Sequence, residues 1–299
     1  MSINFNYNEL VLLKLKEDAL NEGIDVRLSP YYNKQEVLLT DNHENGVNTS
    51  IENNPTKKLY TMNDGNKIVI YSIFQRNTGL KNMDGNPLLY ALKKEKGFGF
   101  ASPYEEKQFW IRFETILDKF IKEFNNDVVV ICPDNPRIKG TSGIIVPSSK
   151  PINKKIAEIL ATHSGITILD KVLRKKNWLE IFSYCNNTDS YFYQYWNKRH
   201  KANFMLNYLY DTYVTDDNFR IHDISNKDNE LRKSITNTLT LNTNNIEDYY
   251  PVINGKDILI IDDTITMCQT FKSAYDVIVE NYVPKSITGL TMFSEKVNI

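Results

Sequence analysis

Apolar residues in the second half of the chain follow two periodicities, one typical of buried strands and one typical of amphipathic helices. Residues 128–132 and 258–261 are unbroken apolar runs rich in branched side chains. Such runs are typical of strands covered on both faces, which occur in parallel sheets flanked by helices. Residues 286–293 are predicted as a further strand. The pattern therefore predicts an α/β fold built on a parallel sheet.

Three segments before and between these strands keep the helical spacing that predicts one buried face. They cover residues 103–124, 152–163 and 270–282. Ser102 and Glu105 form a capping box around Pro103, which predicts the start of the first helix. Thr270 is predicted as the N-cap of the third helix, and Pro284 ends it. The third helix joins the strands at 258–261 and 286–293 into a βαβ unit.

Two adjacent carboxylates, Asp262 and Asp263, directly follow the strand at 258–261. Ligands of open α/β sheets bind beyond the carboxyl ends of the strands. The loop at 266–270 then leads into a helix N-terminus, whose outward N–H groups and positive dipole end favour a phosphate. The sequence thus predicts two acids beside an anion site. The simpler alternative is that both Asp residues end a strand and solvate a turn.

This order of apolar strand, acid pair and Thr-rich loop resembles the 5-phosphoribosyl-1-pyrophosphate (PRPP) motif of the type I phosphoribosyltransferases. The resemblance implies that Asp262 and Asp263 hold the ribose hydroxyls and are the catalytic pair. It assigns the 5′-phosphate to the loop, whose candidate residues are Thr264, Thr266, Met267, Cys268, Gln269 and Thr270. Met267 replaces a usual small hydroxyl residue and Cys268 the commonest Gly. A side chain at these places strains a tight loop or narrows the approach to it.

Cations for the pyrophosphate leaving group have several candidates. Arg137 and Lys139 lie in the turn-rich segment 133–140 after the first strand, where the family places its pyrophosphate loop. The segment 148–150 competes with them, because it follows an apolar run and precedes a helix. Arg174 is a further candidate, as part of the mobile catalytic loop that the family often places between its second and third core strands. Solvated loop cations remain the alternative reading for Arg137 and Lys139.

Within the family, residues from about 100 to 299 look most like the ComF-type branch, named for a DNA-uptake protein. The helix led by Asn153 resembles that branch's Asn-led helix after the first strand. Residues 172–174 resemble its following Leu-Arg, and residues 231–241 its Arg-bearing segment ahead of the PRPP motif. The branch's usual Arg-Gly-Phe is absent before Asn153.

The resemblance implies a phosphoribosyltransferase fold and transfer of phosphoribose from PRPP to a nitrogenous base, with release of pyrophosphate. Mg²⁺ enters with PRPP rather than on direct protein ligands. Two alternatives stay open: a PRPP- or nucleotide-binding regulator without catalysis, and a ComF-like accessory protein in DNA handling. A haloacid dehalogenase-type phosphatase is disfavoured, since its acids lie two apart and here they are adjacent. The acceptor base is left open, and a homodimer is one candidate assembly because many relatives dimerise.

The first hundred residues are predicted as an α+β extension, a candidate hood or accessory region, ahead of a core at 101–299 with an insertion at about 175–230. Residues 59–62 and 67–74 predict a hairpin turning at 63–66, and residues 8–20 a helix. Residues 96–100 copy the start of an RNA-recognition strand. The helix predicted from Pro103 removes the context that such a strand needs. The aromatic-rich insertion is predicted either to cap the site or to form a satellite core.

Composition narrows the partners. The 299 residues carry a formal net charge of -1, which disfavours binding to nucleic acid or anionic membranes through long-range electrostatics. No apolar stretch has the length of a bilayer span, so a cytoplasmic protein is expected. The three Cys and four His residues are scattered, which disfavours a disulfide framework or a direct metal site.

Overall fold

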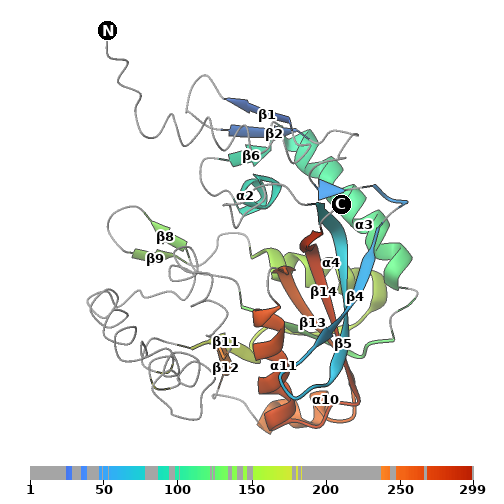
Figure 1. Cartoon of the computed structure of the whole chain (residues 1–299), viewed down its shortest axis with the longest axis vertical. Coiled ribbons are helices and arrows are strands. Elements are labelled where there is room, and N and C mark those ends of the chain that lie inside the picture. The colour runs from blue at the N-terminus through green and yellow to red at the C-terminus, as the bar shows by residue number, and fades with distance from the viewer. Residues whose placement is uncertain are drawn as a thin grey trace.

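The computed structural model describes residues 25–28, 35–38, 47–48, 50–52, 54–77, 87–93, 98–100, 102–121, 123, 125–133, 137–139, 144–146, 151–176, 180, 183, 237–242, 247–265 and 268–297. Its centre is a seven-stranded, mainly parallel sheet (Figure 1). Along the main path the strands run in the order β10 (Thr167–Leu169), β7 (Val128–Ile131), β13 (Asp257–Thr264), β14 (Ser286–Val297), β5 (Lys67–Asn77) and β3 (Val47–Asn48). The predicted α/β fold is confirmed.

The parallel part of the sheet comprises β10, β7, β13, β14 and β5. β13 lies between β7 and β14, with Ile258 beside Val128 and beside Ile287. β3 and β4 (Thr56–Thr61) both pair antiparallel with β5. The strand that carries the acid pair is therefore central, with a parallel neighbour on each side.

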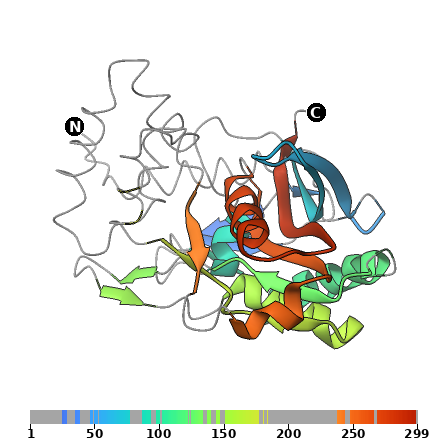
Figure 2. The ribbon, with the colours of Figure 1, turned by 90° about the horizontal axis from the view of Figure 1, so that it is seen from below.

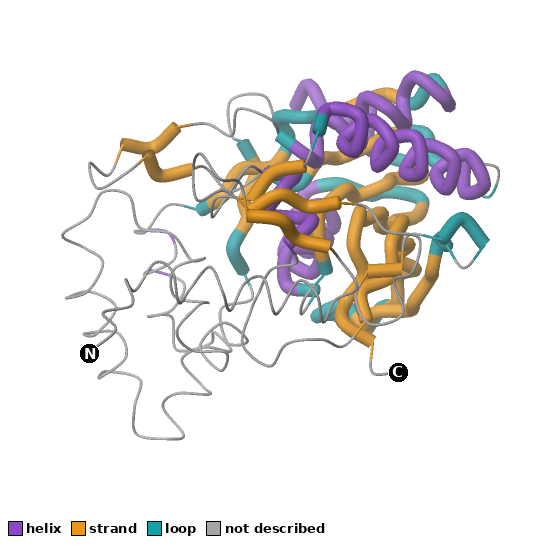
Figure 3. The backbone as a smooth tube through the Cα atoms, turned by 90° about the horizontal axis from the view of Figure 1, so that it is seen from above, coloured by secondary structure: helices purple, strands orange, loops and turns teal. Residues whose placement is uncertain are grey.

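Helices cover both faces of this sheet (Figures 2 and 3). On one face, Leu259 and Ile261 join a core with α3 (Pro103–Ile121) and α4 (Ile152–Ser164). On the other, Ile258 and Ile260 join a core with α11 (Gln269–Asn281). The alternation explains why the run at 258–261 has no polar position, since both of its faces are buried.

α11 packs closely on the sheet because β14 has a glycine beneath it. A Cβ atom built on Gly289 would lie 2.7 Å from Cε1 of Phe271 and 2.9 Å from Cγ1 of Ile70. Phe271 is fully buried at the first turn of α11. The missing side chain of Gly289 thus sets the distance between the helix and the sheet, and with it the place of the helix N-terminus.

Helix boundaries agree with the sequence in most places. α3 begins at Pro103, and the Glu105 amide donates to the Ser102 hydroxyl at 3.3 Å, as the capping box predicts. α3 ends at Ile121, short of the predicted 124, while α4 and the strands near 128, 258 and 286 lie where expected. A short helix, α10 (Tyr250–Ile253), follows the 3-10 turn η3 (Glu247–Tyr249) and leads into β13.

The predicted N-terminal hairpin is confirmed and is longer than expected. β4 pairs with β5 from Thr56 to Thr61, and the Met62 amide donates to the Asn66 carbonyl across the turn at 2.7 Å. Since β5 pairs with β14, residues from both sides of the predicted boundary at 100 build one sheet. The division into an extension and a core stays a prediction, and the expected helix at 8–20 lies outside the described residues.

The remaining N-terminal elements form a small separate sheet beside α2 (Pro87–Lys93). Its order is β1 (Asp25–Leu28), β2 (Gln35–Leu38) and β6 (Phe98–Phe100). Phe100 packs against the main core, with its ring 5.8 Å from that of Phe109. The chain then enters α3 at Pro103, where the sequence predicted the start of a helix.

Two further sheets have two short strands each. β8 (Arg137–Lys139) pairs with β9 (Ile144–Val146), away from the main sheet (Figures 1 and 3). β11 (Leu173–Lys175) pairs with β12 (Leu239–Leu241). The Lys176 amide donates to the Thr238 carbonyl at 3.0 Å. The two ends of the predicted insertion therefore lie side by side, and most of the insertion itself lies outside the described residues.

Candidate functional site

The acid pair lies within β13, near its carboxyl end, rather than in the loop beyond the strand. Asp262 and Asp263 belong to the strand, which continues to Thr264. Asp262 is only 8% exposed, whereas Asp263 is half-buried. Successive strand residues face opposite sides, so Asp262 shares the parity of Ile260, beneath α11, and Asp263 that of Ile261. The two carboxylates are therefore unequal, and Asp263 is the more accessible.

Asn153 ties three elements together at this end of the sheet. It lies in the first turn of α4 and is fully buried. Its Nδ2 donates to the Cys132 carbonyl, just past β7, at 2.9 Å and to Oδ1 of Asp262 at 3.3 Å. An amide that donates to a buried carboxylate fixes the orientation of that carboxylate. Asn153 thus holds Asp262 in place, a contact that the sequence did not indicate.

The segment between β13 and α11 is anchored on both sides. The Ile265 amide donates to the Phe293 carbonyl of β14 at 3.1 Å. Thr266 and Met267 lie outside the described residues. Cys268 is the N-cap of α11, with its carbonyl accepting from the Lys272 amide at 2.9 Å. The predicted N-cap, Thr270, was therefore wrong by two positions and lies inside the first turn.

Cys268, at the position where the PRPP motif most often has Gly, adopts a left-handed backbone conformation. Its φ of 59° lies in the region that L residues rarely adopt, and it is the one non-glycine residue with positive φ in the described part of the chain. The side chain is buried, and this burial raises the pKa of the thiol to about 12, with the charge of Asp262 adding to the rise and that of Lys272 opposing it. The thiol is therefore neutral at physiological pH, and its Cβ occupies space that a glycine would leave open.

Three buried oxygen atoms around the acid pair have no hydrogen-bond partner within the described part of the chain. They are Oδ1 of Asn153, Oγ1 of Thr264 and Oε1 of Gln269. Buried polar atoms normally have partners, so such atoms mark places where a donor is missing. Each accepts hydrogen bonds, so hydroxyl or N–H groups of a ligand suit them. Gln269 also begins α11, whose first-turn N–H groups have no acceptor within the helix.

The candidate cations lie in two separate two-stranded sheets, β8–β9 and β11–β12. Arg137 and Lys139 lie in β8, a strand and not the turn that the sequence predicted. They alternate along that strand and so share one face of the hairpin, opposite Val146 and Ile144. Their side chains and residues 147–150 lie outside the described part of the structure. Their role in holding pyrophosphate stays a prediction.

Arg174 lies in β11, and its guanidinium forms a two-pronged ion pair with Glu180. Nη1 lies 2.8 Å from Oε2 and Nη2 lies 2.6 Å from Oε1. This hydrogen bonding raises the pKa of Arg174 further. The predicted mobile loop is here a paired strand, and an anion must compete with Glu180 for Arg174.

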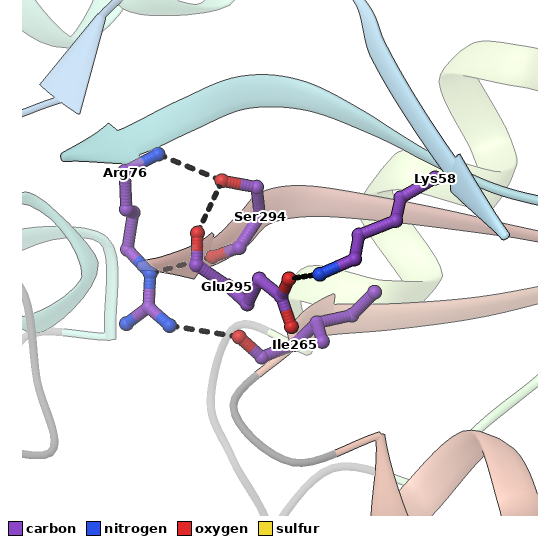
Figure 4. Close-up of polar contacts among 5 residues, drawn as sticks. All are labelled: Lys58, Arg76, Ile265, Ser294 and Glu295. Atoms are coloured by element: carbon purple, nitrogen blue, oxygen red, sulfur yellow. Dashed lines mark hydrogen bonds and ion pairs between the residues drawn. The ribbon is translucent and has the colours of Figure 1, made fainter. Parts of the chain in front are cut away.

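Sequence reasoning missed Arg76, a buried cation in β5 that is 2% exposed. Its Nη2 donates to the Ile265 carbonyl at 2.8 Å, directly ahead of the loop (Figure 4). Its charge lowers the pKa of the Tyr60 hydroxyl, against burial and Cys268, which together raise it to about 12. The available signal was a charged residue two positions beyond the apolar run 68–74, which is unusual for a strand of a buried sheet.

No protein-family model matches this chain, and no curated protein matches it. In the described residues, no group of three or more His, Cys, Asp or Glu side chains is placed to hold a metal ion. None of the described helices has the length and apolar character that a membrane crossing requires. The site is therefore defined by its geometry: two acids, a helix N-terminus and three buried acceptors at the carboxyl end of a central strand.

Proposed function

We propose that this chain is a phosphoribosyltransferase-like protein that binds PRPP with Mg²⁺ and transfers its phosphoribosyl group to a nitrogenous base. The observation that carries the proposal is the acid pair at the carboxyl end of β13, followed by a loop into the N-terminus of α11. The resemblance to the PRPP motif assigned these roles to the same residues. The proposal includes that the parallel sheet and its helices have the phosphoribosyltransferase fold.

The placement of acids and helix suits the two ends of a sugar phosphate. Asp262 and Asp263 are hydrogen-bond acceptors for ribose hydroxyls, as are Oγ1 of Thr264 and Oδ1 of Asn153. The N–H groups and dipole of α11 favour the 5′-phosphate. Two carboxylates beside an anion site suit a ligand that carries both hydroxyl donors and a phosphate. Mg²⁺ arrives with PRPP and neutralises its pyrophosphate, so the protein needs no metal cluster of its own.

In the reaction, the bond from C1′ to the pyrophosphate oxygen breaks and its electron pair leaves with pyrophosphate. A nitrogen of the acceptor forms the new bond to C1′ from the opposite face and loses its proton. The half-buried Asp263 favours the positive charge that develops on the sugar ring. Asp262, fixed by Asn153, orients the ribose. Arg137 and Lys139 are the proposed partners of the departing anion.

Calorimetric titration with PRPP, with and without Mg²⁺, tests the proposal. Micromolar binding that strengthens with Mg²⁺ is the expected result. Ribose 5-phosphate serves as the matched control ligand, because it retains the hydroxyls and the phosphate but lacks pyrophosphate. It should bind more weakly and without dependence on Mg²⁺. Absence of PRPP binding in both conditions rejects the proposed function.

A second function, a PRPP or nucleotide sensor without catalysis, is favoured by the geometry of Cys268. A side chain at φ 59° in the loop that should hold the phosphate narrows the space for a reacting ligand. Pyrophosphate release in the presence of PRPP and a panel of nucleobases separates the two functions. Binding with release supports the transferase, and binding without release supports the sensor. The ComF-like role in DNA handling is a version of the second function.

A further inference from the structure

We infer that Arg76 is the positioning residue of the phosphate loop: it clamps the carbonyl of Ile265 and so fixes the point where the chain leaves β13. The inference deepens the proposed function and rests on it for the identity of the ligand. Its structural part, a clamp on the loop, is independent of which anion binds.

The clamp reaches across a strand. β5 and β13 are separated by β14, so the main chain of Arg76 cannot pair with the end of β13 directly. The side chain bridges this gap. Nε donates to the Ser294 carbonyl of β14 at 2.7 Å, and Nη2 donates to the Ile265 carbonyl at 2.8 Å (Figure 4). One planar guanidinium therefore joins the ends of three strands.

An irregularity in β14 makes the contact possible. Phe293 pairs with Phe74 and Lys296 with Arg76, so β14 has one residue more than β5 between these pairs. Such a bulge interrupts the ladder and frees main-chain groups for other partners. Ser294, in the bulge, is used twice, since its carbonyl accepts from Nε and its hydroxyl accepts from the Arg76 amide at 2.8 Å. Bulges that redirect groups in this way occur often next to active sites.

Both main-chain polar groups of Ile265 are thereby hydrogen-bonded. Its amide donates to the Phe293 carbonyl and its carbonyl accepts from Arg76. Its side chain is buried as well. The residues that follow lead directly into the N-cap of α11 at Cys268. These contacts fix the point at which the chain leaves β13, directly ahead of the segment to which the proposed function assigns the phosphate.

The position of the contact along the chain points the same way. The carbonyl that Arg76 holds belongs to Ile265, and Cys268, the N-cap of α11, follows three residues later. The guanidinium carries a fixed positive charge, and its low-dielectric surroundings strengthen the effect of that charge on an anion. Arginine suits this position better than lysine, because its rigid fork meets two carbonyls in different directions while its charge stays fixed.

The test compares Arg76→Lys with Lys58→Met. Lysine keeps the charge and loses the fork. Lys58 forms an ion pair with Glu295 in the same bulge but lies on the exposed side, so its loss perturbs the bulge without touching Ile265. Hydrogen exchange of the free protein, followed by mass spectrometry, reports on peptides covering residues 264–272. Arg76→Lys should speed exchange there at least tenfold, with the sheet peptides at 128–132 and 258–262 unchanged.

Ligand binding supplies the second readout. Arg76→Lys should weaken PRPP binding with Mg²⁺ at least tenfold, and should raise KM for PRPP far more than it lowers kcat. Lys58→Met should change both exchange and affinity by less than twofold. Ser294→Ala removes the hydroxyl, which accepts from the Arg76 amide and donates to the Glu295 carbonyl, and leaves the contact of Nη2 to Ile265 in place. It should give an intermediate increase in exchange of about threefold and serves if Arg76→Lys does not fold.

Any one of three results overturns the inference. The first is unchanged exchange at 264–272 in both Arg76→Lys and Ser294→Ala. The second is an increase in exchange spread evenly over the whole sheet, and the third is an equal increase at 264–272 in Lys58→Met. Failure of the proposed function looks different. If the natural chain does not bind PRPP while Arg76→Lys still frees residues 264–272, the clamp stands and only the ligand is wrong. If the natural chain binds PRPP and Arg76→Lys binds it equally well, the clamp is wrong and the function stands.

Discussion

The two ends of β13 both carry carboxylates, and the surroundings of these carboxylates differ. At the start of the strand, Asp257 accepts hydrogen bonds from Nζ of Lys285 at 2.7 Å and from the hydroxyl of Ser286 at 2.5 Å. Its amide donates to Oδ2 of Asp127 at 3.0 Å. At the other end, Asp262 is buried, and its Oδ1 accepts from the side-chain amide of Asn153 at 3.3 Å.

The same contrast extends to the neutral groups. At the start of the strand, Asn126 bonds the Thr288 hydroxyl at 3.1 Å, and main-chain bonds join the loops on either side. Near the acid pair, buried oxygens of Asn153, Thr264 and Gln269 have no partner among the described residues. Carboxylates alone therefore do not mark a functional site. A buried acceptor without a partner costs free energy unless another group donates to it, and this argument favours the end of β13 that carries the acid pair as the candidate site.

The sharpest way to break this comparison is to neutralise one carboxylate at each end. Asp263→Asn should lower pyrophosphate release at least 100-fold, because a neutral amide no longer favours the charge that develops on the ribose. Its melting temperature should stay within about 2 °C, since the residue is half-buried at the strand end. Asp257→Asn is the matched control at the opposite end and should leave turnover unchanged. Normal turnover in Asp263→Asn removes the acid pair from the mechanism.

Removing an amide at each end tests the role of Asn153. Asn153→Ala deprives the Cys132 carbonyl and Asp262 of a donor in a fully buried setting. The free energy of unfolding should fall by about 1–3 kcal/mol, and PRPP binding should weaken about tenfold.

Asn126→Ala is the control for Asn153→Ala, because Asn126 also donates through its amide but at the opposite end of the sheet. It should cost less stability and leave PRPP binding unchanged. Thermal unfolding and calorimetry measure the two effects separately. Equal loss of affinity in both variants means that Asn153 acts only through general stability.

Cys268 tests whether the loop itself limits binding. Cys268→Gly relieves a left-handed conformation worth about 1 kcal/mol but loses a buried thiol and makes the unfolded chain more flexible, each worth a similar amount. Stability should therefore change by less than about 1 kcal/mol. PRPP affinity should rise about threefold or more, since the approach to the loop widens. Cys268→Ala separates the causes: equal affinity in the two variants assigns the effect to the thiol rather than to the backbone.

Much of this architecture follows from the sequence. The runs at 128–132 and 258–261 have no polar position, and only a strand buried on both faces has that pattern. The acid pair was predicted because its neighbours in sequence form the motif. The N-cap was placed at Thr270 because hydroxyl residues are preferred there, whereas the structure uses Cys268 in a left-handed conformation. A local preference was overridden by the way α11 packs on Gly289.

The contacts that complete the site were beyond sequence reasoning because they join distant segments. Arg76 and Ile265 are 189 positions apart and meet only through the bulge in β14. Asn153 was noted for a resemblance, but its bond to Asp262 depends on how α4 lies over the end of β7. Arg137 and Lys139 were placed in a turn, since Pro, Asp and Asn precede them, and long-range pairing with 144–146 made that segment a strand.

The smallest expected effect concerns the start of β13 and its dependence on pH. The hydrogen bond from Lys285, followed by that from Ser286, holds the pKa of Asp257 below its ordinary value. A carboxyl whose pKa is lowered in the folded state stabilises the protein above the unfolded pKa of about 4, and that stabilisation is lost as the pH falls through the lower folded value. Asp257→Asn should therefore lower the melting temperature by no more than about 3 °C at pH 7. The difference should shrink as the pH falls below about 4 and disappear once the pH lies below the folded pKa of Asp257, where both chains are neutral at this position. A series of melting curves from pH 7 to pH 2 measures it, and a gap that persists in acid would mean that Asp257 acts through packing rather than charge.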